Sequence, residues 1–209
     1  MMNKGLLIVI SGPSGAGKGT ICKALLKKQA FWLSVSATTR KPRNGEVDGK
    51  SYFFLEVDEF KNRISKDGFL EYAEVYGNYY GTPKASVQER INRGEDVILE
   101  IDIQGALKVK ENYPEGVFIF ILPPSMEELK KRIIGRGSET KESLLRRFTS
   151  AYKEINYVSK YNYAVINDEV DKATKKIENI IVAERCRVDR IKDNIIDSKE
   201  GTVYEQFYD

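Results

Sequence analysis

The sequence predicts an α/β domain in which helices cover a parallel sheet. Two observations favour this class. Short apolar runs alternate along the chain with segments of helical periodicity, as expected when strands and helices follow one another. The first apolar run leads directly into a glycine-rich loop that is followed by a helical segment. A length of 209 residues suits one such domain with small insertions.

The predicted strands are the short apolar runs, and the helices lie between them. Ser125 and Glu128 form a capping box after Pro123 and Pro124, which predicts that a helix begins there. The strands are expected at Leu6–Ile10, Trp32–Ser36, Val97–Ile101, Val117–Leu122 and Tyr163–Ile166. The helices are expected near residues 18–29, 84–93, 104–112, 125–135, 140–159 and 169–192.

The last predicted helix, 169–192, carries apolar residues at helical spacing, which indicates a stripe that faces the core. The stripe consists of Val170, Ala173, Ile177, Ile180, Ile181, Val188 and Ile191.

Two stretches interrupt the alternation of strands and helices. Residues 37–83 contain short β-like pieces separated by glycines, which predicts an insertion with its own small sheet. Residues 135–147 place two glycines around Arg136 before a charged segment, a pattern that suits a mobile lid. Both insertions are expected beyond the carboxyl ends of the core strands, where open α/β sheets bind ligands.

Composition excludes several function classes. Hydrophobic residues make up 41% and charged residues 31%, which argues against disorder and against a membrane protein. The N-terminal apolar run is too short for a signal peptide, so a cytoplasmic protein is expected. Cys22 and Cys186 offer neither a disulfide framework nor metal-ligand spacing. A net charge of +3 with interspersed signs gives no nucleic-acid footprint, and the absence of histidine excludes histidine-based catalysis.

The stretch GPSGAGKGT, residues 12–20, matches the phosphate-loop pattern of one glycine, four residues and then Gly-Lys. Its glycines let the backbone wrap round a phosphate, and the dipole of the following helix favours the anion. Lys18 adds a charge that can reach the β and γ oxygens. Gly19 stands where a Ser or Thr usually contacts magnesium, so Thr20 is left to orient magnesium-bound water. The loop therefore predicts binding of a nucleoside triphosphate.

The insertion predicts a second phosphate site. Arg40 and Arg43 lie three residues apart, and Tyr52, Tyr79 and Tyr80 follow between glycine turns. Guanidinium groups and tyrosine hydroxyls suit a dianionic phosphate monoester. Each of these residues, taken alone, could equally be a solvated arginine or a core tyrosine. Their occurrence beside a phosphate loop favours the binding interpretation.

The chain resembles the guanylate kinases, which phosphorylate GMP with ATP. The matching stretches include SGPSGAGKGT, SVSATTRKPRNGEVDGKSYFF, FLEYAEVYGNYYGTP, ILEIDIQGA and FILPPSMEELKKRIIGRGSE, and they extend from residue 5 to about 182. The resemblance implies a P-loop nucleoside triphosphate hydrolase-like three-layer fold with a five-stranded parallel core sheet. It also implies a core at 1–36, 84–125 and 158–192, a GMP-binding insertion at 37–83 and a lid at 126–157, while the tail at 193–209 stays unassigned.

The same resemblance implies roles for individual residues. Lys18, Arg43, Arg136 and Arg147 correspond to the catalytic charges. The ATP-binding set is Gly12, Pro13, Ser14, Gly15, Ala16, Gly17, Lys18, Gly19, Thr20, Arg132, Arg136 and Asn167. Guanine is expected to contact Ser36, Glu71, Thr82 and Asp102, and the GMP phosphate to contact Arg40, Arg43, Tyr52 and Tyr80.

Mg²⁺ is the implied cofactor, with ATP as phosphoryl donor. No protein group is expected to bind it directly, and Thr20 and Glu100 are expected near it through water. Glu100 stands where the family usually has aspartate. The implied reaction is direct in-line transfer to GMP and dGMP, in purine nucleotide metabolism and GMP recycling, by a monomer or homodimer that binds no nucleic acid and no membrane.

Two other function classes share this core. Guanylate-kinase-like scaffold domains bind peptides without catalysis, but they usually lack the intact phosphate loop that residues 12–20 form here. A different small-molecule kinase on the same core would not need the guanine set of Ser36, Glu71 and Thr82.

Overall fold

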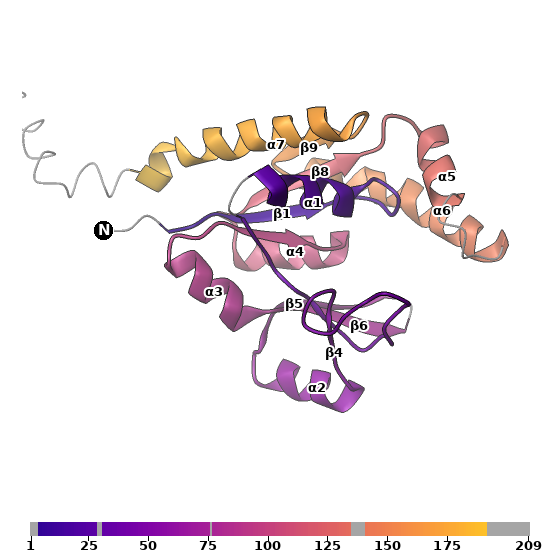
Figure 1. The fold of residues 1–209 in the computed structure, drawn as a ribbon, viewed down its shortest axis with the longest axis horizontal. Coiled ribbons are helices and arrows are strands. Elements are labelled where there is room, and N and C mark those ends of the chain that lie inside the picture. Colours follow the sequence, from indigo (N-terminus) through magenta and orange to yellow (C-terminus); the bar gives the residue numbers. More distant parts are fainter. Residues whose placement is uncertain (1–3, 29–30, 76, 135–140, 192–209) are drawn as a thin grey trace, which may run out of the picture.

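Figure 1 shows the computed structural model of the chain, which describes residues 4–28, 31–75, 77–134 and 141–191, with the helix backbone alone for 141–147. A parallel sheet of five strands lies at its centre, and its strand order is β2-β7-β1-β8-β9. The prediction of a five-stranded parallel core is therefore confirmed. The strands are β1 (Leu7–Ser11), β2 (Trp32–Leu33), β7 (Val97–Glu100), β8 (Val117–Leu122) and β9 (Tyr163–Ile166).

Helices cover both faces of this sheet (Figure 1). On one face lie α1 (Lys18–Lys28) and α7 (Val170–Arg185), and on the other lie α3 (Lys84–Asn92) and α4 (Ile103–Asn112). Beyond the carboxyl end of β8, the chain forms α5 (Met126–Ile134) and α6 (Lys141–Ile155), and a 3-10 turn at Asn156–Lys160 then leads to β9. The phosphate loop connects β1 to α1 at the carboxyl edge of the sheet.

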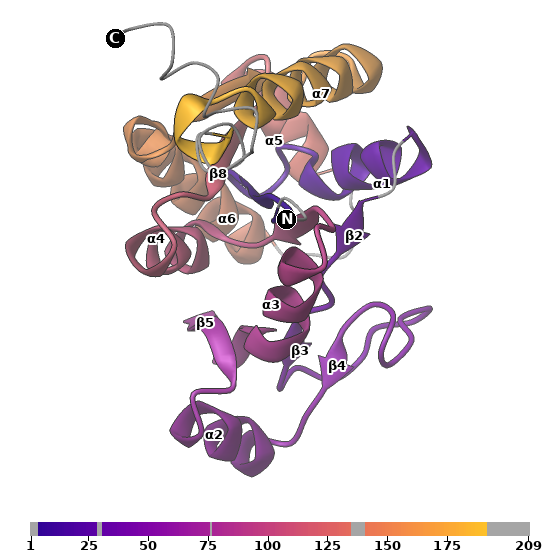
Figure 2. The ribbon, with the colours of Figure 1, turned by 90° about the vertical axis from the view of Figure 1, so that its left-hand side faces the viewer.

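A second sheet of four strands lies at the opposite end of the molecule from α7 (Figure 2). Its order is β4-β3-β6-β5, with β3 at Ala37–Thr38, β4 at Phe53–Phe54, β5 at Phe69–Val75 and β6 at Asn78–Pro83. Helix α2 (Val57–Ser65) closes its core, because the buried Phe60 ring stacks 4.4 Å from Phe69 and 5.5 Å from Tyr79, centroid to centroid.

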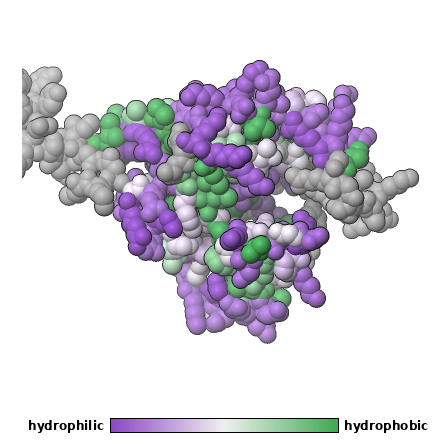
Figure 3. All heavy atoms as spheres, viewed as in Figure 1, coloured by the Kyte–Doolittle hydropathy of each residue, from purple (hydrophilic) through white to green (hydrophobic). Residues whose placement is uncertain are grey.

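Most of the face seen in Figure 3 is hydrophilic, as expected for the charged sides of the covering helices. Within the described ranges, no helix is both long enough and apolar enough to span a membrane.

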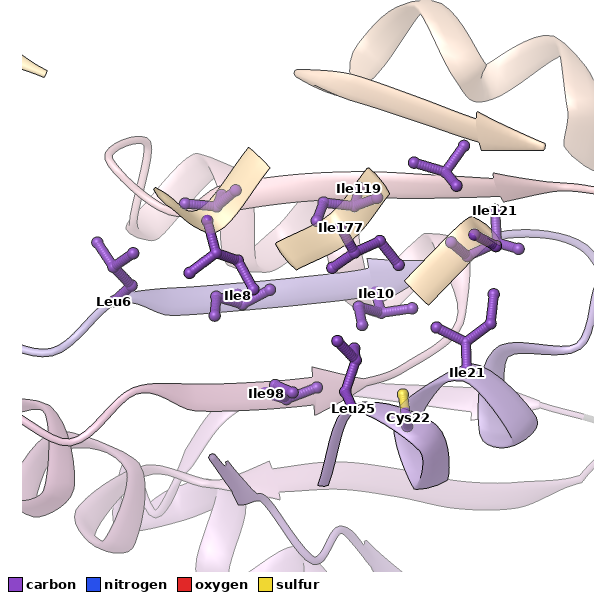
Figure 4. Packing of buried hydrophobic residues seen from close by; sticks show 14 of the residues in the cluster. Leu6, Ile8, Ile10, Ile21, Cys22, Leu25, Ile98, Ile119, Ile121 and Ile177 are labelled. Atoms are coloured by element: carbon purple, nitrogen blue, oxygen red, sulfur yellow. The ribbon is translucent and has the colours of Figure 1, made fainter. Parts of the chain in front are cut away.

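The main core follows from the alternation of β1. Ile8 and Ile10 pack with Ile21 and Leu25 of α1 and with Ile177 of α7, as Figure 4 shows. Their neighbours along the strand point to the other face, toward α3 and α4. Burying each such side chain stabilises the fold by about 1.5 to 3 kcal/mol. This core holds the carboxyl ends of β1 and β7 rigidly, which positions the residues that follow them.

Three element ends differ from the sequence prediction by three residues or more: those of β2, of α6, which ends at Ile155 rather than 159, and of α7. Strand β2 ends at Leu33 rather than Ser36, although the Ser34 amide still donates to the Ile98 carbonyl at 2.9 Å. Helix α7 ends at Arg185, with Cys186 as its C-cap. The assignment of Val188 to the core-facing stripe was therefore wrong, because Val188 lies beyond the helix and is 73% exposed.

Candidate active site

The phosphate loop is held from behind by Asn167, which follows β9. The Asn167 Nδ2 atom donates to the Ala16 carbonyl at 2.8 Å. A Cβ atom on Gly17 would lie 2.3 Å from this nitrogen, and the φ of Gly17 is +93°, so both the space and the backbone require glycine. Asn167 is only 3% exposed. Its side chain therefore supports the loop, and its expected contact with adenine stays a prediction.

Lys18 lies at the start of α1 and reaches back over its own loop. Its Nζ atom donates to the carbonyl oxygens of Gly12 and Pro13, at 2.5 and 3.2 Å. These carbonyls hold the ammonium group at the mouth of the loop, where it also lines the pocket described below. The position suits a charge that contacts an arriving phosphate.

Helix α6 contacts the loop from the other side. The Ser14 amide donates to the Glu154 carboxylate at 3.3 Å, and the Ser150 hydroxyl donates to the same carboxylate at 2.7 Å. Arg132 on α5 donates to Glu128 at 2.9 Å and to the Asn167 carbonyl at 3.2 Å. The loop, α5, α6 and the end of β9 are thus linked by polar contacts.

Glu100 ends β7 beside the first turn of α1. A Cβ atom on Gly19 would lie 3.2 Å from Glu100 Oε1, so this carboxylate stands where the side chain of a Ser or Thr would be. Cys22 is buried beside it. Burial, together with the nearby Glu100 carboxylate, raises the pKa of the Cys22 thiol, which keeps the thiol protonated. The Glu100 carboxylate therefore lies next to the phosphate loop, near the Lys18 ammonium group and the Cys22 thiol.

The loop after β3 organises the predicted phosphate-binding residues. Arg40 donates to Glu46 through two bonds of 2.9 Å and to the Lys41 carbonyl at 2.7 Å, and a further side-chain hydrogen bond joins it to Tyr80. The Arg43 amide also donates to Glu46, at 2.7 Å. Hydrogen bonding from Arg40 lowers the pKa of the Glu46 carboxyl, and the same hydrogen bond raises the pKa of the Arg40 guanidinium. Glu46 therefore anchors the loop, and the group contains an acceptor that the sequence interpretation did not include.

Two tyrosine rings complete this group. The Arg40 guanidinium lies 5.4 Å from the centroid of the Tyr52 ring, and Tyr80 packs edge-on against Tyr52 at 6.1 Å. Burial raises the pKa of the Tyr52 hydroxyl. The structure thus brings together Arg40, Tyr52 and Tyr80, whereas the side chain of Arg43 is exposed.

Glu71 and Thr82 face each other across the pairing of β5 and β6. The Thr82 hydroxyl donates to Glu71 Oε1 at 2.7 Å, and both residues are buried. Burial raises the pKa of the Glu71 carboxyl to about 7; the charge of Asp102 adds to this, while the Thr82 hydrogen bond and Lys108 oppose it. Asp102 itself caps α4, because its side chain accepts from the Gly105 amide at 2.8 Å.

One pocket of about 240 Å³ gathers most of the predicted GMP-binding residues, together with Lys18 and Glu100. Its lining comes from both sheets: Lys18, Glu100 and Asp102 from the five-stranded part, and Ser36, Tyr52, Glu71 and Tyr80 from the second sheet and its connections. Thr82 and Arg40 lie directly behind Glu71 and Tyr52. Thr20 is exposed on α1. Arg136 and the side chain of Arg147 lie outside the described residues.

Sequence reasoning missed Glu46, Glu154 and the position of Cys22 beside Glu100. Only Glu46 left a signal, since it is an acidic residue in the turn that follows two spaced arginines. The other contacts join residues far apart in the chain, and no local sequence pattern predicts them.

Comparison with known proteins agrees with this geometry. The guanylate kinase family model matches residues 4–184. The guanylate kinase of Clostridium acetobutylicum is 82% identical over all of both chains. That of Caldanaerobacter subterraneus subsp. tengcongensis is 66% identical, over 96% of this chain and 98% of its own. The crystal structure of guanylate kinase from Anaplasma phagocytophilum superimposes with a TM-score of 0.79 at 33% identity, over 95% of this chain and 98% of that one. The chain belongs to the guanylate kinase family.

Proposed function

We propose that this pocket is where the chain transfers the terminal phosphoryl group of ATP to GMP. One observation carries the assignment of the site: Lys18, at the end of the phosphate loop, and Glu71 on β5, which accepts from Thr82, line the same pocket. A phosphate-binding loop on one side and a buried carboxylate on the other suit a triphosphate donor and a nucleobase-bearing acceptor.

Guanine recognition is assigned to Glu71 on the basis of hydrogen-bond polarity. Guanine offers N1–H and the 2-amino group as adjacent donors, and an ionised carboxylate accepts both. Ser36, Thr82 and Asp102 are proposed to complete the base contacts. Adenine would turn its unprotonated N1 toward the carboxylate and leave acceptors opposed and unpaired, which such a site rejects by several orders of magnitude.

The acceptor phosphate is assigned to Arg40, Arg43, Tyr52 and Tyr80. A phosphate oxygen of GMP is already a nucleophile, so the reaction needs no general base, and the absence of histidine from the chain is no obstacle. Catalysis then depends on alignment of the two substrates and on stabilisation of the charge that spreads over the transferring group. Lys18 supplies part of that stabilisation, and Arg136 and Arg147 are proposed to add to it.

The residues near the loop also fit Mg²⁺ bound together with ATP. Glu100 and Thr20 offer oxygen donors beside Gly19, and hard oxygen donors are those that Mg²⁺ prefers. Among the described residues, no three His, Cys, Asp or Glu side chains cluster closely enough to hold a metal by themselves. We therefore propose that Glu100 and Thr20 act through water. When bound, the ion neutralises charge on the phosphate oxygens.

dGMP is proposed as a second acceptor, because the assigned contacts address the base and the phosphate and not the 2′ position of the sugar. The reaction belongs in purine nucleotide metabolism, where it returns GMP to the diphosphate pool. A cytoplasmic location stays a prediction, as does a monomer or homodimer.

The test is an ADP-release assay with ATP and a panel of acceptors. GMP and dGMP should be phosphorylated efficiently, and AMP, CMP and UMP should react at least about a hundredfold more slowly in kcat/KM. A Lys18→Met variant should fold normally and lose at least about a hundredfold in turnover. If AMP serves as well as GMP, the assignment of the guanine site is wrong, and if Lys18→Met stays active, the assignment of Lys18 is wrong.

A further inference from the structure

Gly105 lies in the first turn of α4, against the carboxylate of Glu71. A Cβ atom on Gly105 would lie 2.6 Å from Glu71 Oε2 and 3.0 Å from Glu71 Cδ. The third nearest atom is Glu71 Oε1, at 3.6 Å. All three nearest neighbours therefore belong to one carboxylate, and a side chain at position 105 would compete with it for the same space.

Backbone conformation does not account for this glycine. Gly105 is not among the glycines with positive φ, and its torsions are those of the helix. Glycine inside a helix costs about 1 kcal/mol relative to alanine. The helix therefore gives up stability at this position, and the Glu71 carboxylate is what occupies the space that alanine would take.

Glu71 cannot easily move aside. Its Oε1 atom accepts the Thr82 hydroxyl at 2.7 Å, and the residue is only 7% exposed. Its Oε2 atom lies against the first turn of α4, where the helix dipole favours a negative charge. The carboxylate is thus fixed between β6 on one side and the amino end of α4 on the other, with its pocket side left for a ligand.

We propose that Gly105 is a specificity-determining residue for the acceptor base. It keeps open the space in which Glu71 sits, so that both oxygens are placed to accept the two adjacent donors of guanine. This inference rests on the proposed guanine-reading role of Glu71. Gly105 itself is a positioning residue that acts through Glu71.

The experiment is a double-mutant cycle with Gly105→Ala and Glu71→Ala. In the parent background, Gly105→Ala should lower kcat/KM for GMP by about tenfold to a hundredfold, because it displaces a base contact. The loss should appear mainly in KM for GMP, with KM for ATP changed by less than about twofold. The melting temperature should fall, because the new Cβ overlaps a carboxylate that cannot easily move aside, and the better helix propensity of alanine offsets only part of that cost. Gln104→Ala, on the exposed side of the same turn, should change none of these values.

The Glu71→Ala background separates this role from a packing role. There the carboxylate is gone, so Gly105→Ala should change kcat/KM for GMP by less than about twofold. If Gly105→Ala in the parent background is unstable, the double variant should recover the melting temperature of Glu71→Ala.

Each other outcome is decisive. Gly105→Ala with unchanged GMP efficiency, or with equal losses in both backgrounds, overturns this proposal while leaving the proposed function in place. An unchanged GMP efficiency in Glu71→Ala alone would show that Glu71 does not read guanine, and the role of Gly105 would fall with it.

Discussion

At the level of single residues, Glu71 is both buried and proposed to bind guanine as a charged group, and burial opposes that charge. Binding guanine needs an ionised carboxylate, yet burial raises the pKa of Glu71 from 4.5 to about 7. The folded protein therefore holds this charge at an energetic cost at neutral pH. Because the chain contains no histidine, the usual titrating group of this pH range is absent.

The free-energy cost of burying the ionised Glu71 carboxylate predicts that Glu71→Gln stabilises the fold in a pH-dependent way. Between about pH 4.5 and pH 7 the folded wild type binds more protons at Glu71 than the unfolded chain does, so its free energy of unfolding falls as pH rises through this window. Glutamine has no such loss. The variant should therefore gain up to about 3 kcal/mol relative to wild type between about pH 5 and pH 8, in urea unfolding at each pH.

The matched control is Glu74→Gln, an exposed carboxylate on the same strand. Its stability relative to wild type should not change with pH. A stability difference for Glu71→Gln that is the same at both pH values would mean that Glu71 titrates as an ordinary carboxyl group.

At the level of elements, the loop between β3 and β4 depends on Glu46. Glu46→Ala should raise KM for GMP by about tenfold, because Arg40 then loses its two anchoring bonds and must be ordered when the phosphate binds. KM for ATP should be unaffected. Glu56→Ala, an exposed residue of the same segment that makes no side-chain cap, is the control for steady-state kinetics. Tighter GMP binding in Glu46→Ala would instead show that Glu46 competes with the phosphate for Arg40.

The elements differ in how well their sequence predicts them. Strands β1, β7 and β8 were predicted within one residue because each is a short apolar run that is buried on both faces along most of its length. Strands β2 and β9 are only partly buried, and their apolar runs alone predicted them. The start of α5 was also predicted, and the Ser125 hydroxyl accepts from the Glu128 amide at 3.1 Å. Only half of the capping box forms, since the Glu128 side chain binds Arg132 instead.

Helix α2 was missed. Its N-terminal flank, SYFFLEV, has strong β propensity, and this outweighed the weaker helical signals that follow. Those signals were present: Asp58 and Glu59 in the first turn, Arg63 in the last turn, and Phe60 and Ile64 at a spacing of four residues.

The residues of the candidate site also differ in how far the sequence predicts them. Residues in recognisable motifs could be named from the sequence, but Gly105 and Glu154 act through contacts that only the fold creates.

At the level of the whole molecule, the pocket is shared by two sheets, and this predicts how each substrate protects the backbone. GMP alone should slow amide hydrogen exchange in β5, in β6 and in the first turn of α4. An ATP analogue alone should slow it in the loop at residues 12–20. The division of the chain into a GMP-binding insertion and a core predicts separate patterns, with α4 as the place where GMP reaches the core.

Exchange would be measured by mass spectrometry on the full chain, with AMP as the acceptor control. If GMP protected only the loop at residues 12–20, the insertion at 37–83 would not be the acceptor site.

The arrangement of the second sheet also bears on how such enzymes can change over evolution. The chain enters this sheet through β3 and leaves it through β6, and these two strands are paired neighbours, with Ala37 opposite Gly81. The two ends of the segment 37–83 therefore lie side by side, which is the condition under which a whole segment can be inserted or exchanged without disturbing its host. A new acceptor-binding segment could replace it while the phosphate loop stayed unchanged. One residue of the host, Gly105, would have to change with the exchanged segment, because the present acceptor-binding carboxylate rests against it.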